Sequence, residues 1–166
     1  MKIIHLSLLL ALGLNSLPSL ARDTTAPITI EADRLEMSQL DGRSHYHGNV
    51  HLQQGKMSLR ADTLEIIQQE GQLQRAIAQG RPAIMEMPDE QTGQLIRGHA
   101  RQMNYRLADD TVEMRGEAIL WRGKDEFRGD HLIYQIGLGQ VQAFGSTRSD
   151  GVEGRVRIIL QQDGRQ

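Results

Sequence analysis

The sequence predicts an all-β fold, and three observations lead to that class. Apolar and polar residues alternate along most of the chain, which is the pattern of strands that bury one face. Turn segments rich in Gly, Asp and Asn separate the alternating runs at short intervals. The pattern also repeats, because residues 48–56 recur 68 residues later as 116–124. A constant period predicts one supersecondary unit stacked on a copy of itself, so we expect two similar halves.

Residues 1–21 predict a cleaved export signal that precedes this fold. Lys2 gives a positive start, residues 3–14 form a short apolar stretch, and Ser19 and Ala21 supply the small residues of a cleavage site. The apolar stretch is short for a membrane span, which leaves an uncleaved anchor as the less favoured alternative. The signal is bacterial in type, so the periplasm is the expected compartment. The chain has no cysteine, and no disulfide can stabilise it there.

Residues 22–166 are predicted to form one domain of successive short strands. The clearest alternating runs occur, in chain order, at 28–32, 50–52, 57–61, 64–66, 85–87, 103–107, 112–114, 132–136 and 156–158. A helix competes best over 64–78, but Gly71 lies in the middle of that stretch and Gly139 occupies the equivalent place in the second copy. Because a glycine inside a helix costs about 1 kcal/mol, both positions predict turns between strands.

Two kinds of interior fit this pattern. The inward candidates are mostly aliphatic residues and methionine, and aromatic residues make up only 4% of the chain. An ordinary closed core is one interpretation. The other is an open apolar interior, since methionine packs adaptably against irregular partners such as acyl chains.

No group of residues predicts catalysis, a metal site or a cofactor. His45, His47 and His51 could offer three imidazoles to a metal, but the equivalent positions of the second copy carry other residues. Asp62 and Asp130 are equivalent to each other in the repeat, which favours a structural role over a glycosidase pair. The sequence therefore predicts a protein that is not an enzyme, with no catalytic residues, no metal and no cofactor.

The charge pattern argues against a nucleic-acid partner. The formal net charge is −2, and acidic and basic residues are interspersed rather than gathered into a basic stripe. Aromatic platforms for stacked bases are also scarce.

Eight short segments form an ordered set along the chain: 27–33 (PITIEAD), 48–50 (GNV), 61–62 (AD), 80–83 (GRPA), 98–105 (GHARQMNY), 116–118 (GEA), 129–130 (GD) and 142–144 (QAF). Together they resemble the OstA-like domain of lipopolysaccharide transport. The resemblance covers nearly all of residues 22–166. It implies an open β-jellyroll, or β-taco, of about sixteen short antiparallel strands whose interior holds the acyl chains of lipid A.

The resemblance also implies a set of groove residues. Ile28, Ile30, Met85, Tyr105 and Leu107 match inward positions of the family. Alternation alone adds Leu52, Leu59 and Met103, because residues two apart on a strand share a face.

The same resemblance implies strand pairing with partners at both ends of the domain. The expected partners are inner-membrane LptC-like and outer-membrane LptD-like OstA domains, together with further copies in a head-to-tail homo-oligomer. Unpaired edge strands can accept another strand in this way. The expected docking edges are Ile28, Thr29 and Ile30 at the first strand, and Val156, Ile158 and Leu160 at the last.

Two functions of different classes follow from these observations. The leading hypothesis is a periplasmic bridge that binds lipopolysaccharide in its apolar groove and carries it from the inner to the outer membrane. The alternative is a periplasmic β-sandwich or solenoid adaptor that binds no ligand. An apolar interior open at both ends favours the first.

Overall fold

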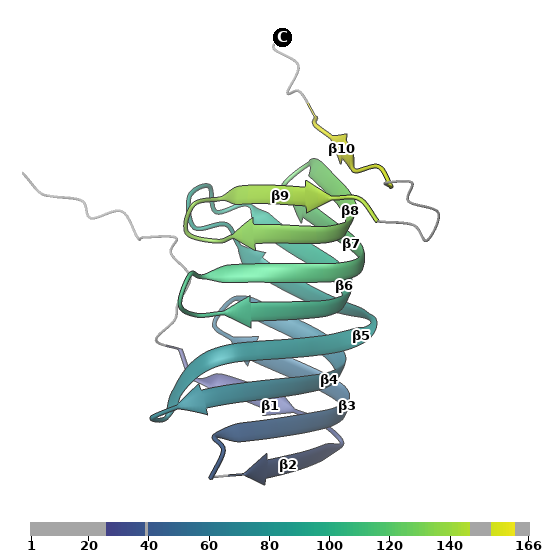
Figure 1. Ribbon diagram of the computed structural model, residues 1–166. Helices are drawn as coiled ribbons and strands as arrows, with labels where there is room; N and C mark the ends of the chain where they lie inside the picture. Colours follow the sequence, from purple (N-terminus) through teal and green to yellow (C-terminus); the bar gives the residue numbers. More distant parts are fainter. Residues whose placement is uncertain (1–25, 39, 147–153, 162–166) are drawn as a thin grey trace, which may run out of the picture.

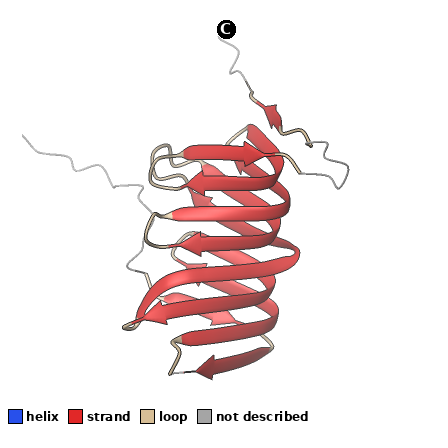
Figure 2. Ribbon diagram, in the orientation of Figure 1, coloured by secondary structure: helices blue, strands red, loops and turns tan. Residues whose placement is uncertain are grey.

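The protein is built from strands that form one antiparallel sheet. A computed structural model describes residues 26–38, 40–146 and 154–161, and the predicted signal peptide, residues 1–21, lies outside them. The regular elements of this part of the chain are all strands (Figure 2). They are β1 (Ile28–Glu31), β2 (Arg34–Ser38), β3 (Arg43–Gln54), β4 (Met57–Gln69), β5 (Gln72–Pro88), β6 (Leu95–Arg106), β7 (Thr111–Arg122), β8 (Asp125–Gln135), β9 (Gln140–Phe144) and β10 (Arg157–Ile159). The predicted all-β class is confirmed, and no described segment is a helix long and apolar enough to cross a membrane.

The sheet is open, with two short strands at each end. Its order is β1-β3-β4-β5-β6-β7-β8-β10, with β2 also paired to β3 and β9 also paired to β8. The strands are stacked in two layers, from β1 and β2 at one end to β9 and β10 at the other (Figure 1). Since neighbours in the sheet are mostly neighbours in the chain, short turns suffice to connect them.

The strands are fewer and longer than expected. The sequence predicts about sixteen short strands, whereas the described residues form ten, and β3 to β8 are 11 to 17 residues long. The pairing register shifts partway along these strands, for example between His47 and Val50 and between Arg115 and Ala118. A bulge at such a point bends a strand without ending it. The short alternating runs of the sequence are therefore straight segments of longer, bent strands.

Glycines of the repeat lie at two of these bulges, which form corners in the strands. Gly48 and Gly116 both have a φ of +76°, a conformation that glycine adopts at little cost. A Cβ at Gly48 would collide with the Asp33 carboxylate, which accepts a hydrogen bond from the Asn49 side chain at 2.9 Å. The repeat thus marks equivalent places where the sheet folds over itself.

The fold produces two facing walls, each with a continuous row of inward residues. In the first wall the paired residues are Ile30, Leu52, Leu59, Met85, Gly98, Leu120, Phe127 and Ile158. In the second wall they are Leu35, Tyr46, Leu64, Ala78, Met103, Met114, Leu132 and Ala143. The hydrophobic core lies between these rows.

Tyr134 is the largest fully buried side chain of that core. Its hydroxyl has no hydrogen-bond partner among the described residues. Burial, together with the Asp89 carboxylate, raises the pKa of Tyr134 to about 12, because both disfavour the phenolate.

We expect Tyr134→Phe to stabilise the protein at neutral pH by about 1 kcal/mol, because an unpaired buried hydroxyl is costly. The unfolded chain releases the tyrosine proton near pH 10 and the folded chain near pH 12, so this residue lowers stability as pH rises between those values. The substitution should remove that loss. Urea unfolding at pH 7 and across pH 10–12 measures both effects, with Tyr46→Phe as the control. A destabilised variant would show that the hydroxyl has a partner after all.

Candidate functional site

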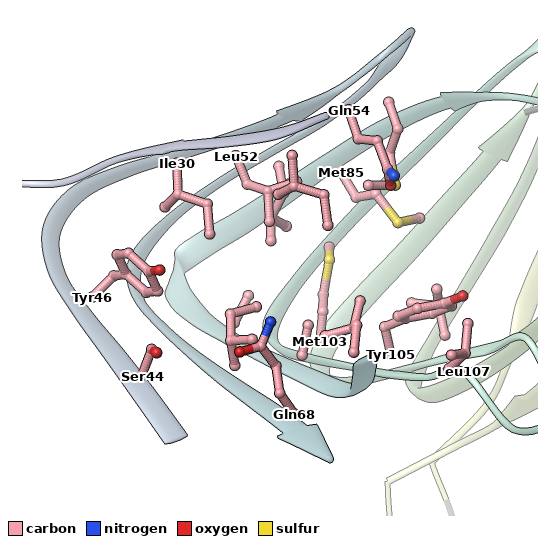
Figure 3. A pocket seen from close by; sticks show the side chains of 18 of the residues that line it. Ile30, Ser44, Tyr46, Leu52, Gln54, Gln68, Met85, Met103, Tyr105 and Leu107 are labelled. Carbon is pink, nitrogen blue, oxygen red and sulfur yellow. The ribbon is translucent and has the colours of Figure 1, made fainter. Parts of the chain in front are cut away.

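A cavity of about 560 Å³ lies between the two walls. It begins at β1 and β3 and extends past β6 (Figure 3). Its size falls within the range of roughly 300–1,000 Å³ that is usual for ligand pockets. The open interior, rather than a wholly closed core, is therefore present in this part of the molecule.

The structure brings all eight predicted groove residues together around this cavity. They are Ile28, Ile30, Leu52, Leu59, Met85, Met103, Tyr105 and Leu107. Side chains from opposite walls point toward one another, as Ile30 and Leu52 do with respect to Tyr46, and Met85 with respect to Met103 (Figure 3). Cross-strand pairing of Ile30 with Leu52, and of Leu59 with Met85, sets this arrangement. Their part in lipid binding stays a prediction.

The sequence reasoning found eight of the 22 lining residues and missed the other 14. The additional apolar residues are Met37, Tyr46, Met57, Ile66, Leu73, Ala76, Ala78, Met87, Val112 and Ile136. The alternation pattern could have found Met57, which shares a face with Leu59. Ala76 and Ala78 give little hydrophobic signal, and each corner bulge changes which residues face inward along a strand.

The lining suits a neutral, apolar ligand. Among the described residues that line the cavity, none carries a formal charge, and the polar ones besides the tyrosines are Ser44, Gln54, Gln68 and Gln72. The Tyr105 hydroxyl donates a hydrogen bond to Asp110 Oδ1 at 3.0 Å, which holds the ring against the second wall. Apolar surface buried here contributes about 25 cal/mol per Å².

The inward rows reach both ends of the sheet, where they are exposed. Leu35 and Met37 of β2 are 49% and 60% exposed, and Ile158 of β10 is 51% exposed. Ile158 pairs with the inward residue Phe127, and Leu35 pairs with the cavity residue Tyr46. Within the described residues, the inward positions exposed at β2 and β10 are therefore apolar.

The predicted docking residues lie at the ends of the sheet. Ile28, Thr29 and Ile30 belong to β1, Ile158 belongs to β10, and Val156 and Leu160 flank β10. The sequence reasoning did not identify β2 and β9, which are also terminal strands. Residues 32 and 33 separate β1 from β2, and residues 145–156 lie between β9 and β10.

The other polar candidates lie outside the cavity. The His45 and His47 rings stack 6.5 Å apart, and His45 lies 3.9 Å from Glu65, which Arg43 also contacts at 2.7 Å. No group of three or more His, Cys, Asp or Glu that could hold a metal ion occurs in the described part of the chain. Asp62 and Asp130 are exposed, and neither lines the cavity.

Comparison with known proteins identifies the family. The model of the family described as LptA/(LptD N-terminal domain) LPS transport protein matches residues 29–140. The chain belongs to this family of lipopolysaccharide transport proteins, as the resemblance predicted. Within the family it is LptA-like, being 32% identical to the lipopolysaccharide export system protein LptA of Escherichia coli K12 over 85% of this chain and 79% of that protein.

Two further comparisons involve Pseudomonas aeruginosa. The lipopolysaccharide export system protein LptH is 25% identical, over 90% of this chain and 86% of that protein. The crystal structure of LptH, described as the LptA homologous periplasmic component of the lipopolysaccharide transport device, aligns with a TM-score of 0.75 at 22% identity. That alignment covers 85% of this chain and 99% of the LptH chain, and it shows a common fold.

We expect Leu107→Asp to weaken binding of an apolar fluorescent dye by about tenfold, because a carboxylate at the cavity wall resists desolvation. Leu107 is 44% exposed, so the protein should still fold. Leu138→Asp is the matched control, since Leu138 is an exposed turn residue outside the cavity lining. Dye titration with a circular dichroism check measures both variants. Equal weakening by the two substitutions would contradict the assignment of the cavity as the dye site.

Proposed function

We propose that this protein binds the acyl chains of lipopolysaccharide in its cavity and carries the lipid between the two membranes. The observation that carries the proposal is the uncharged apolar cavity between two inward rows that reach both ends of the sheet. Membership of a lipopolysaccharide transport family supports it, as do the names of the E. coli and P. aeruginosa relatives.

The proposal places the protein in the periplasm. The structurally similar LptH is described as a periplasmic component, and residues 1–21 have the pattern of a cleaved signal. The working protein would then be residues 22–166, one jellyroll domain of two similar halves. The equal φ angles of Gly48 and Gly116 support the description as two halves.

The proposed partners dock on the terminal strands. Another copy, or an LptC-like or LptD-like OstA domain, would add its edge to β1 and β2 or to β9 and β10, which continues the backbone pairing. A docked copy would also cover the exposed inward residues Leu35, Met37 and Ile158. The result is a head-to-tail assembly with a continuous groove.

We further propose that the protein performs no catalysis. The described cavity lining contains tyrosines and neutral polar side chains but no carboxylate, imidazole or amine, and acid–base catalysis most often uses such groups. Directional movement of lipid would then depend on energy supplied by another component.

Photo-crosslinking in cells tests the proposal. A photoreactive residue in place of Leu107, which lines the cavity, should crosslink to lipopolysaccharide. The same probe in place of Arg106, which pairs with Asp109 at 2.8 Å and lies outside the lining, is the control. The mass of the recovered protein should correspond to a chain that begins at Arg22.

The outcomes separate the candidate functions. Crosslinks from position 107 and not from 106 support an internal lipid path. Crosslinks from neither position, in folded protein with active probes, favour the adaptor that binds no ligand. Equal crosslinking from both would show that the assignment of inside and outside is wrong.

A second prediction concerns the docking edge. Ile158→Asp should weaken head-to-tail self-association by at least about tenfold, because it places a charge where the inward rows of two copies would meet. Ile159→Asp on the same strand is the matched control, since Ile159 pairs with Glu126 and alternates to the outer face. Sedimentation velocity over a range of concentrations measures the change. An equal effect of both substitutions would contradict an interface organised by the interior.

A further inference from the structure

The interior is open in one part of the molecule and closed in another. The cavity ends at Met87, Val112 and Ile136. Beyond it, Met114, Leu120, Leu132 and Tyr134 are fully buried. The two walls touch at this boundary, because a Cβ at Gly98 would lie only 3.0 Å from Met114 Sδ on the opposite wall. The groove is thus shut toward β8, although the inward rows continue there.

Hydrogen bonds join the two walls at the edge of the closed part, where the strands end in turns. We call the gap between the walls at this edge the mouth of the groove. Arg122 at the end of β7 donates from Nη1 to the Gly139 carbonyl oxygen at 2.8 Å. Gln91 in the turn between β5 and β6 makes a longer contact, 3.4 Å from Nε2 to the Gly137 carbonyl oxygen. Arg122 belongs to the first wall, and both glycines follow β8 in the second wall. We call Arg122, Gln91, Gly137 and Gly139 the clasp.

The repeat allows the clasp to be compared with the equivalent positions in the first copy. Residues 68 positions earlier than Arg122 and Gly139 are Gln54 and Gly71. Gln54 lines the open cavity and donates to the Ala26 carbonyl oxygen at 3.1 Å. A Cβ at Gly71 would meet nothing within 4 Å, whereas one at Gly139 would lie 3.3 Å from Gln91 Oε1. The first half of the repeat therefore has an open mouth where the second half is bridged.

The turn that carries Gln91 is well ordered by its own hydrogen bonds. Asp89, only 3% exposed, accepts the backbone N–H groups of Gln91 at 2.8 Å and Thr92 at 2.9 Å. The Asp89 N–H donates to the Gln94 carbonyl oxygen at 2.7 Å. This turn therefore holds Gln91 over the mouth as a defined structural element.

The closed packing also carries a cost. The Tyr134 hydroxyl is buried in the closed part without a hydrogen-bond partner among the described residues, and an unsatisfied buried hydroxyl destabilises the arrangement that buries it. Opening the mouth would give this hydroxyl access to water or to a polar group of a ligand. The closed state therefore depends on the clasp and on apolar contact between the walls.

We propose that the clasp holds shut a second compartment of the groove, lined by Leu120, Leu132 and Tyr134, and that a lipid acyl chain entering from the open cavity releases it. We call this closure by the clasp, with its release by lipid, the latch. Arg122 is its positioning residue. The inference rests on the proposed function. It accounts for how a cavity of about 560 Å³, the size of a pocket for one drug-sized ligand, could accommodate a lipid with several acyl chains.

Distances between spin labels across the mouth test the latch. The chain has no cysteine, so cysteines at Thr92 and Leu138 can be labelled selectively on the two sides of the clasp. A second pair at Lys56 and Glu70 spans the open mouth as a reference. Arg122→Gln gives the clasp the residue that the open half carries, and Arg101→Gln, which removes an exposed ion pair with Glu117, is the matched control. Crosslinking from position 107 is measured in the same variants.

Purified lipopolysaccharide should lengthen the 92–138 distance in the unsubstituted protein. Arg122→Gln should lengthen it without ligand and shift the closed–open equilibrium by about three- to tenfold, the effect of one hydrogen bond. The 56–70 distance should not change in Arg122→Gln. In the Arg101→Gln control, both distances should match those of the protein without either substitution. If Arg122→Gln does not fold, Gln91→Ala removes the other contact and should act in the same direction.

The result also distinguishes the two proposals. Crosslinks at 107 with a 92–138 distance that changes neither with lipopolysaccharide nor with Arg122→Gln would overturn the latch and leave lipid binding intact. Loss of crosslinks at 107 would overturn the proposed function, and the latch with it.

Discussion

The structure depends on antiparallel pairing that continues through a corner in every long strand. Because side chains alternate along a strand, pairing that stays in register within each straight segment of β3 to β8 aligns inward residues into rows on both walls. The bulges, with glycine at Gly48 and Gly116, bend the strands so that the two rows face each other. The walls, the cavity and the terminal strands all follow from this bending.

An open sheet has consequences for both the interior and the ends. A closed barrel would satisfy its edges by pairing them, whereas here β1, β2, β9 and β10 remain terminal. The exposed inward residues at these strands, among them Met37 and Ile158, would gain from contact with a neighbour. An apolar occupant of the cavity would gain in the same way, because both remove apolar surface from water. Binding of an apolar ligand and binding of a partner would thus have one physical origin.

The sequence repeat allows equivalent positions of its two copies to be compared. Gln54 and Gly71 border an open mouth, and their equivalents Arg122 and Gly139 are joined by a hydrogen bond. Similarly, Ile66 lines the cavity, while its equivalent Tyr134 fills the closed part. Side-chain substitutions on a common backbone plan therefore decide whether the walls separate or touch.

Alternation and turn chemistry predicted the fold class, the turns at Gly71 and Gly139, and the inward positions of Leu52, Leu59 and Met103, while the family resemblance supplied the other five of the eight predicted residues that line the cavity. Alternation and turn chemistry are local, so they can be read without tertiary contacts. The strand count, the second pair of terminal strands and the lining role of Ala76 and Ala78 became apparent only from the folded protein. It also decided where the cavity ends, because that depends on contact across the walls between Gly98 and Met114. Gly98 and Met114 lie on the paired strands β6 and β7 but on opposite walls, so they meet only after the corners bend, and no local pattern encodes that meeting.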